Sequence, residues 1–270
     1  MNPLLSLIIA VYNKPDFLEK ILLSLKNQTF RGFEVLVADD GSGPEIAETI
    51  KKFGDGFQFP VHHVWHEDCG FRKTIVVNEA IARAKADYIV FIDGDCILHH
   101  RFLERHYLRR RKGVVLAGHR VKLDRELSAS ISADDIRSCS FEKKSFWRSH
   151  CYKHHWRHGI YFPPFFYFEY FFGRKLSIIG SNFSVHKSDL AEINGYDETI
   201  IGRGFEDTNL TARFRLQGIR IKSIIREALQ YHLFHKEDPI PHNAEAITKF
   251  CNPDSAWAPT GLDHHTKPLD

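Results

Sequence analysis

The chain has 270 residues, of which 43% are hydrophobic and 26% charged, as is ordinary for a globular protein that buries a sizeable core. Its 37 lysines and arginines barely exceed its 34 aspartates and glutamates, so charge gives no reason to expect a nucleic-acid partner. Five cysteines without a C-x-x-C pair argue against a disulfide framework or a zinc ribbon, and favour reduced thiols in the cytoplasm. We also expect no signal peptide and no membrane-spanning segment, because no basic leader is evident and no apolar run reaches about 18 residues.

The first half of the chain alternates between strand patterns and helix patterns. Four short segments are rich in apolar, β-branched and aromatic residues, as buried strands are: residues 4–11, 33–38, 61–65 and 88–92. Helical patterns lie between them, beginning near Pro15 and Pro44 and over residues 74–86. This alternation predicts an α/β fold with a mostly parallel central sheet flanked by helices.

Polar side chains follow three of these strands at the points where they end: Tyr12-Asn13, Asp39-Asp40-Gly41-Ser42 and Asp93-Gly94-Asp95. In parallel sheets ligands bind beyond the carboxyl ends of the strands, so we expect these groups to line one site. Two acids that leave a buried strand need a counter-charge, which Mg²⁺ or Mn²⁺ would supply while holding a phosphate-bearing substrate. An ordinary polar turn is the alternative for Asp93-Gly94-Asp95.

Two common nucleotide-binding signatures are absent from the sequence. No G-x-G-x-x-G follows the first strand, and there is no G-x-x-x-x-G-K-[ST]. A dinucleotide-dependent dehydrogenase and a P-loop NTPase are therefore disfavoured.

Three segments, residues 6–15 (SLIIAVYNKP), 37–42 (VADDGS) and 91–95 (FIDGD), resemble in order and spacing the nucleotide-sugar domain of family 2 glycosyltransferases. The resemblance implies the Rossmann-like GT-A fold. It resumes from Ile179 to His235, which is similar to the C-terminal half shared by galactosyl- and N-acetylgalactosaminyl-transferases. The implied parts are a nucleotide-sugar half (1–122), an aromatic and basic insert or lid (123–176), an acceptor and catalytic half of the same domain (177–238) and a C-terminal tail (239–270).

The resemblance implies which residues hold the nucleotide. Ala10, Tyr12 and Asp40 would bind the base, with Asp40 accepting the imide N–H of uracil, so the implied donor is a UDP-sugar. Arg72 would meet the base, ribose or phosphate region, and Lys73 is a weaker candidate there. The alternatives are an Asx-turn for Asp40 and a surface position for Arg72.

The resemblance also implies a metal site around the D-x-D motif. Asp95 would ligate Mn²⁺ or Mg²⁺, and Asp93, across Gly94, would contact the ribose or the cation through water. A histidine from far along the chain completes the site in the related transferases; His232 aligns best and His235 second. A packed or surface histidine is the alternative.

Catalysis is implied for two acids that open a predicted helix after Phe205. Asp207 would be the general base that removes the acceptor proton in an in-line displacement with inversion, and Glu206 would bind acceptor or sugar hydroxyls. Asn182 is a candidate to bond the donor sugar. An acid that merely favours the helix dipole is the alternative.

The insert over residues 123–176 breaks the strand–helix alternation and places many aromatics beside basic residues. Such a composition suits peripheral contact with a membrane or a lipid-linked acceptor. A lid, or a helical subdomain that packs its aromatics on the sheet, is the equal alternative. A zinc site among His150, Cys151, His154, His155 and His158 is disfavoured, because a second ligand pair at the usual spacing is absent.

We therefore expect a metal-dependent, inverting glycosyltransferase. It would move a hexose or N-acetylhexosamine from a UDP-sugar to a glycan or lipid-linked acceptor in surface polysaccharide or lipopolysaccharide synthesis, in the cytoplasm and at the inner face of the membrane. One alternative is a sugar nucleotidyltransferase, which would need a glycine-rich basic loop after the first strand. Another is a non-catalytic nucleotide-sugar or glycan-binding module.

Overall fold

The computed structural model describes residues 2–54, 56, 58–164, 177–236 and 250–266. Its strands are β1 (Leu5–Val11), β2 (Phe33–Asp39), β3 (Val61–Trp65), β4 (Tyr88–Asp93), β5 (Cys96–Leu98), β6 (Val114–Ala117), β7 (Val121–Lys122), β8 (Phe183–His186), β9 (Arg220–Ser223) and β10 (Gln230–His232). The α-helices are α1 (Pro15–Lys26), α2 (Pro44–Gly54), α3 (Lys73–Arg83), α4 (Phe102–Arg109), α5 (Arg125–Ser130), α6 (Ala133–Arg137), α7 (Lys144–Trp147), α9 (Lys187–Ala191), α10 (Glu206–Leu216) and α12 (Asp263–Thr266). Three short 3₁₀ turns complete the set: η1 (Ser140–Glu142), η2 (Arg148–His150) and η3 (Lys153–Gly159).

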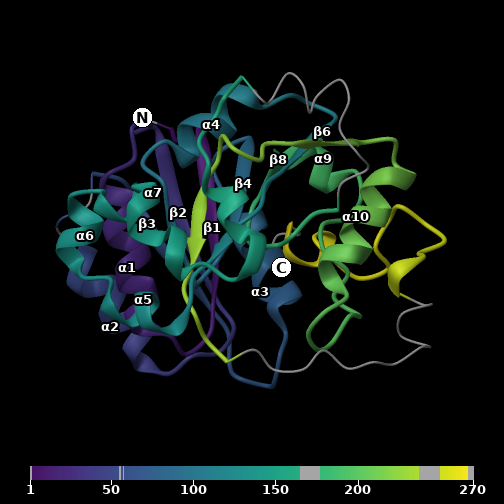
Figure 1. Cartoon of the computed structure of the whole chain (residues 1–270). Helices are drawn as coiled ribbons and strands as arrows, with labels where there is room; N and C mark the ends of the chain where they lie inside the picture. The colour runs from purple at the N-terminus through teal and green to yellow at the C-terminus, as the bar shows by residue number, and fades with distance from the viewer. Residues whose placement is uncertain (1, 55, 57, 165–176, 237–249, 267–270) are drawn as a thin grey trace.

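The main sheet has seven strands in the order β3-β2-β1-β4-β8-β6-β9, and β5-β10-β7 form a smaller sheet. Strands β3, β2, β1 and β4 are parallel, and β8 runs antiparallel to its neighbours β4 and β6. Helices cover both faces of the main sheet (Figure 1). The predicted α/β fold with a mostly parallel central sheet is confirmed.

The register of the central strands brings the predicted polar groups together. Ala10 on β1 pairs with Ala38 on β2 and with Asp93 on β4. The three strands therefore end at one edge of the sheet, and the side chains that follow them share that edge.

The apolar runs of the strands are explained by burial on both faces of the sheet. Leu5, Leu7 and Ile9 of β1 join a core that contains α1, α2 and the insert, whereas Ile8 joins a second core that contains α3, α9 and α10. Figure 1 shows these helix groups on opposite sides of the sheet. A strand that is covered on both faces needs no polar alternation, so its sequence reads as continuous hydrophobicity.

One predicted helix is shorter than its pattern suggested. The helix expected over 74–86 ends at Arg83, because Ala84 turns into an extended conformation with ψ of 128°. Farther along the chain, β8 begins at Phe183. Before it, the amide of Gly180 donates to the Asp207 carboxylate at 2.7 Å instead of joining a ladder.

The described part of the insert, residues 123–164, packs against the sheet as short helices. Its side chains Leu127, Ile136, Phe141 and Trp147 are buried in the same core as α1. This packing agrees with the helical-subdomain alternative for that part. The densest aromatic run, residues 165–176, lies outside the described residues. In the portion of the chain that the structure describes, no helix has the length and apolarity needed to cross a bilayer.

Candidate active site

A cavity of about 420 Å³ lies beyond the carboxyl ends of β1, β2 and β4. Most of the predicted site residues line it: Ala10, Tyr12, Asp40, Asp93, Gly94, Asp95, Glu206 and Asp207. Lysine and arginine side chains also line it, namely Lys14, Lys73, Arg120, Arg203 and Lys236. The cavity thus holds acids beside cationic side chains that suit a phosphate-bearing ligand.

Asp95 meets two histidines from the far end of the chain. Its Oδ2 lies 2.9 Å from Nε2 of His235 and 3.3 Å from Nε2 of His232. The antiparallel pairing of β10 with β5 sets His232 opposite Cys96, the residue after Asp95. Although burial alone would raise it, hydrogen bonds from both histidines hold the pKa of Asp95 well below its usual range.

The donor atoms of Asp95, His232 and His235 all lie within 4.8 Å of one another. A carboxylate oxygen and two imidazole nitrogens form a donor set that fits Mn²⁺ and related divalent cations. Asp95 and His235 also line the cavity, so a cation held there would face a ligand. The sequence offered His232 and His235 as alternatives, and the structure brings both to the same oxygen.

Asp93, the other acid of the motif, has cationic partners instead. Its Oδ1 lies 2.7 Å from Nζ of Lys73, and its Oδ2 lies 3.5 Å from a guanidinium nitrogen of Arg120. Asp93 therefore does not belong to the three-donor group. Gly94 lets the turn close, since its amide donates to the Ala10 carbonyl at 2.7 Å and a Cβ there would lie 2.9 Å from that oxygen.

Asp207, which also lines the cavity, is held by a single backbone donor among the described residues. The amide of Gly180 donates to Oδ2 at 2.7 Å, whereas the buried Oδ1 has no hydrogen-bond partner among the described residues. Burial, opposed by the charge of Lys73 and assisted by the charges of Glu206 and Asp93, raises the pKa of Asp207 to about 7. Such a carboxyl is close to half ionised at neutral pH and can accept a proton.

Glu206 and Asp207 do not cap the helix that they open. Glu206 accepts the amide of Gly204 at 2.8 Å, just outside α10, and Asp207 accepts from the distant Gly180. A Cβ on Gly180 would lie 2.7 Å from the Asp207 carboxylate, so only glycine permits this approach. These contacts favour a site role over a simple dipole effect.

The predicted base-binding end of the cavity is built on Asp40. This carboxylate accepts the backbone amide of Arg72 at 3.0 Å and lies 2.8 Å from Nε2 of His66. Burial raises the pKa of Asp40, although these partners oppose the shift. Tyr12 is half exposed and its hydroxyl donates to Asp68 at 3.0 Å. His66 was not recognised in the sequence, and its place just after the third strand was the available signal.

Three predicted residues, Arg72, Asn182 and His232, are not among the residues that line the cavity, although His232 contacts Asp95, which does. The guanidinium of Arg72 donates to the Glu67 carbonyl at 2.9 Å, while its backbone amide donates to Asp40. Asn182 is fully buried, and its amide nitrogen donates to the carbonyl oxygens of His119 and Ala228 at 2.8 and 3.1 Å. The structure thus puts Asn182 behind the site, where it holds two loops together.

Comparison with known proteins gives two family matches. The pattern of glycosyl transferase family 2 matches residues 6–178, and that of the N-terminal domain of galactosyltransferase matches residues 168–237. Both resemblances drawn from the sequence are thereby confirmed.

Chondroitin synthase of Escherichia coli is 25% identical over 248 residues, which cover 84% of this chain and 34% of that protein. Hyaluronan synthase of Pasteurella multocida is 34% identical over 92 residues, covering 34% of this chain and 9% of that protein. The chain thus spans about a third or less of the length of these curated relatives. The structure of mannosyltransferase PcManGT from Pyrobaculum calidifontis, in complex with GDP-Man and Mn²⁺, is similar with a TM-score of 0.57 at 14% identity, over 88% of this chain and 59% of that one.

Proposed function

The chain belongs to glycosyl transferase family 2, and we propose that it transfers a hexose or N-acetylhexosamine from a UDP-sugar, with inversion, to a hydroxyl of a glycan or lipid-linked acceptor. One observation carries the proposal: Asp207 and the Asp95–His232–His235 group belong to one site, at the carboxyl ends of the strands. A base and a cation site so arranged suit displacement at a sugar phosphate. The names of the two synthases support a role in polysaccharide synthesis.

The donor nucleotide is proposed to bind at the end of the cavity lined by Ala10, Tyr12 and Asp40. The half-exposed ring of Tyr12 offers a face on which a base can stack. The Asp40 carboxylate, already fixed by Arg72 and His66, can accept the imide N–H of uracil. Cytosine and adenine have no ring N–H to donate at this edge, so the contact favours UDP over CDP or ADP, whereas thymine and guanine also carry a ring N–H.

Asp95, His232 and His235 would hold the cation, for which we propose Mn²⁺ or Mg²⁺; the similar mannosyltransferase structure contains Mn²⁺. A cation bound there would neutralise the diphosphate and stabilise it as a leaving group. Asp93, which Lys73 and Arg120 hold in place, is proposed to contact the ribose or the cation through water.

Asp207 is proposed to take the acceptor proton on Oδ1, the oxygen without a partner among the described residues. Gly180 fixes the other oxygen, so the carboxylate is oriented before the acceptor arrives. The charge of Lys73 lowers the pKa of Asp207 against the effect of burial, and so favours the ionised form that acts as a base. Glu206, which faces the same cavity, would bind acceptor or sugar hydroxyls.

A screen of nucleotide sugars by release of the nucleotide, with acceptor glycans and with Mn²⁺ or chelator, tests this function. We expect turnover with a UDP-sugar that chelator abolishes. Turnover with GDP- or dTDP-sugars alone would overturn the donor assignment. Binding of UDP without any turnover would instead favour the non-catalytic binding module.

We also propose that the insert contacts an anionic membrane surface at the inner face of the membrane. Tyr152 and Phe162 are exposed by 58% and 50%, and the charged groups of Lys144 and Arg148 lie 5.8 and 5.7 Å from the centre of the Trp156 ring. Exposed rings beside cations suit the headgroup region. Flotation with phosphatidylglycerol vesicles checks this, and absence of binding at low ionic strength would contradict it.

A further inference from the structure

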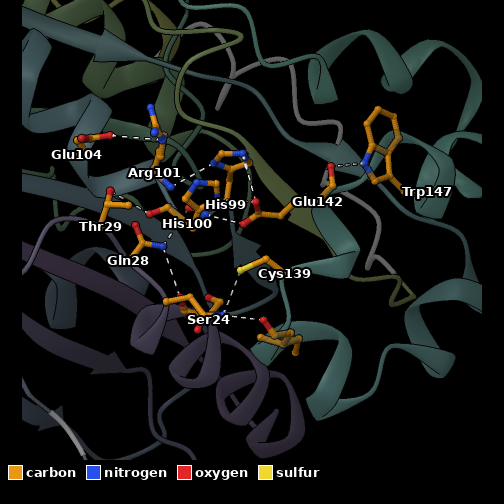
Figure 2. Close-up of polar contacts among 12 residues, drawn as sticks. Ser24, Gln28, Thr29, His99, His100, Arg101, Glu104, Cys139, Glu142 and Trp147 are labelled. Atoms are coloured by element: carbon orange, nitrogen blue, oxygen red, sulfur yellow. Dashed lines mark hydrogen bonds and ion pairs between the residues drawn. The ribbon is translucent and has the colours of Figure 1, made fainter.

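A second group of metal-type ligands lies where the insert meets the segment between β5 and α4 (Figure 2). Glu142, the last residue of η1, points its carboxylate at His99 and His100. Its Oε2 lies 2.6 Å from Nδ1 of His100 and 3.4 Å from Nε2 of His99. Its Oε1 accepts the backbone amide of His100 at 2.6 Å. One carboxylate thus ties the insert to the loop before α4.

The same donor set and the same spacing occur at the candidate active site. There, too, one carboxylate oxygen lies near two imidazole nitrogens, at 2.9 and 3.3 Å. In the part of the chain that the structure describes, these two are the groups in which three metal-type donors lie within 4.8 Å of one another.

A thiol lies beside Glu142, although its sulfur is not among the three donors that lie within 4.8 Å of one another. Cys139 begins the turn into η1 with a left-handed backbone, φ of 56°, and its Sγ accepts from the Asn27 amide at 3.4 Å. Burial raises the pKa of the Cys139 thiol to about 11, and the adjacent Glu142 carboxylate adds to the shift. Figure 2 shows Cys139 below the two histidines, next to α1.

The group lies apart from the cavity. The side chains of His99 and Glu142 are 8% and 9% exposed, and that of His100 is 34% exposed. The ring of Tyr161 stacks on His99 with centroids 5.1 Å apart, and His99 stacks on His100 at 4.4 Å. None of these residues lines the cavity. Metal-type donors that lie away from the ligand cavity suit a structural rather than a catalytic cation.

Charge balance also leaves room for a cation. Among the described residues Glu142 forms ion pairs with the two histidines and with no lysine or arginine. A buried carboxylate whose charged partners are imidazoles alone would gain a stronger counter-charge from a divalent cation.

We propose that His99, His100, Glu142 and Cys139 bind a divalent cation, with Zn²⁺ the best match to imidazole, carboxylate and thiolate ligands. The cation would fasten the insert to the nucleotide-sugar half. Binding releases the thiol proton of Cys139 to solvent, and ligation through Nδ1 of His100 places the ring proton of that imidazole on Nε2. Nδ1 of His99 accepts the Arg101 amide at 3.1 Å, so ligation through Nε2 moves the ring proton to Nδ1 and ends that contact.

The experiment uses the full chain, stripped with chelator and titrated with Zn²⁺ against a chromophoric competitor. We expect Glu142→Gln and His100→Gln to bind one equivalent of Zn²⁺ fewer than the unmodified chain. Their affinity for Zn²⁺ at that site should be weakened by at least about 100-fold. His150→Gln is the matched control, because His150 is also 34% exposed and pairs with a carboxylate, Asp124, at 3.1 Å. The His150→Gln variant should bind as many equivalents of Zn²⁺ as the unmodified chain.

Binding of Co²⁺ tests whether the Cys139 thiolate is a ligand, and the readout does not depend on the stability of the variant. Co²⁺ added to the stripped chain should give a near-ultraviolet thiolate charge-transfer band that Cys139→Ser abolishes and Cys151→Ser, another partly buried cysteine, retains. Unchanged zinc stoichiometry in both Glu142→Gln and His100→Gln would overturn the proposal and leave a metal-free hydrogen-bonded junction. Neither readout depends on transferase activity, so the outcome is independent of the proposed function.

Discussion

The two groups of carboxylate and imidazole in this molecule have the same donors but opposite surroundings. The open group, Asp95 with His232 and His235, borders the cavity beyond the sheet, whereas the closed group, Glu142 with His99 and His100, lies away from the cavity and against Tyr161. The donors are alike, so the roles proposed for the two groups differ only because a ligand in the cavity would meet a cation in the open group.

The comparison predicts that substitutions in the open region change the reaction, whereas those in the closed region change stability. The largest effect is expected for Asp207→Asn, which removes the proposed base. We expect kcat to fall by about 10²- to 10⁴-fold, while the affinity for UDP, measured by calorimetry, stays within about twofold. A variant that bound UDP and kept full transfer would refute the role of Asp207.

The second prediction separates the two acids of the motif. Asp95→Asn should raise the Mn²⁺ concentration needed for half-maximal turnover by about 10- to 100-fold, because it weakens the open group directly. Asp93→Asn should leave that concentration within about threefold, since Asp93 contacts Lys73 and Arg120 instead. Equal shifts in both variants would mean that Asp93 is a direct ligand as well.

The third prediction concerns pH. Asp207 must be ionised to accept a proton, so transfer should rise with pH through about 7, the pKa to which burial raises Asp207. Below that pKa the rate should fall about tenfold for each pH unit. Because the charge of Lys73 lowers the pKa of Asp207, Lys73→Gln should move the acid limb of the rate profile to higher pH.

Lys73→Arg keeps the charge and serves as the control, with an acid limb close to that of the unmodified chain. Because Lys73 also pairs with Asp93, a uniform loss at all pH values is expected in addition. Only the change in the shape of the profile reports on Asp207. If the acid limb of the Lys73→Gln rate profile stayed in place, Lys73 would position Asp93 without lowering the pKa of Asp207.

The smallest effect on the reaction is expected in the closed region. Glu142→Gln should leave kcat at saturating Mn²⁺ within about twofold, yet lower the free energy of unfolding in urea by about 1–3 kcal/mol, because His100 and its backbone lose a buried acceptor. Asp124→Asn is the control: its side chain is 39% exposed, so about 1 kcal/mol or less is expected. Loss of activity with unchanged stability would contradict the division between the two regions.

The sequence by itself determined the α/β fold, the ends of the central strands and the polar groups that follow them. Apolar runs such as residues 4–11 and 88–92 could be interpreted because a strand buried on both faces is uniformly hydrophobic. The placement of Asp40 and Asp93 in one cavity followed from the rule that ligands bind at the carboxyl ends of strands, whereas Asp207 was assigned to the site by the family resemblance.

Only the tertiary structure decided which side chains meet. His235 lies 140 residues from Asp95 in the chain and Glu142 lies 42 residues from His100, yet each pair shares a hydrogen bond. Asn182, which the motif placed beside the sugar, is buried behind the site with its amide fully engaged. Periodicity reports the neighbours of a residue along one helix or strand. Contacts between distant segments depend on how whole elements pack, and that packing is not encoded in any local pattern.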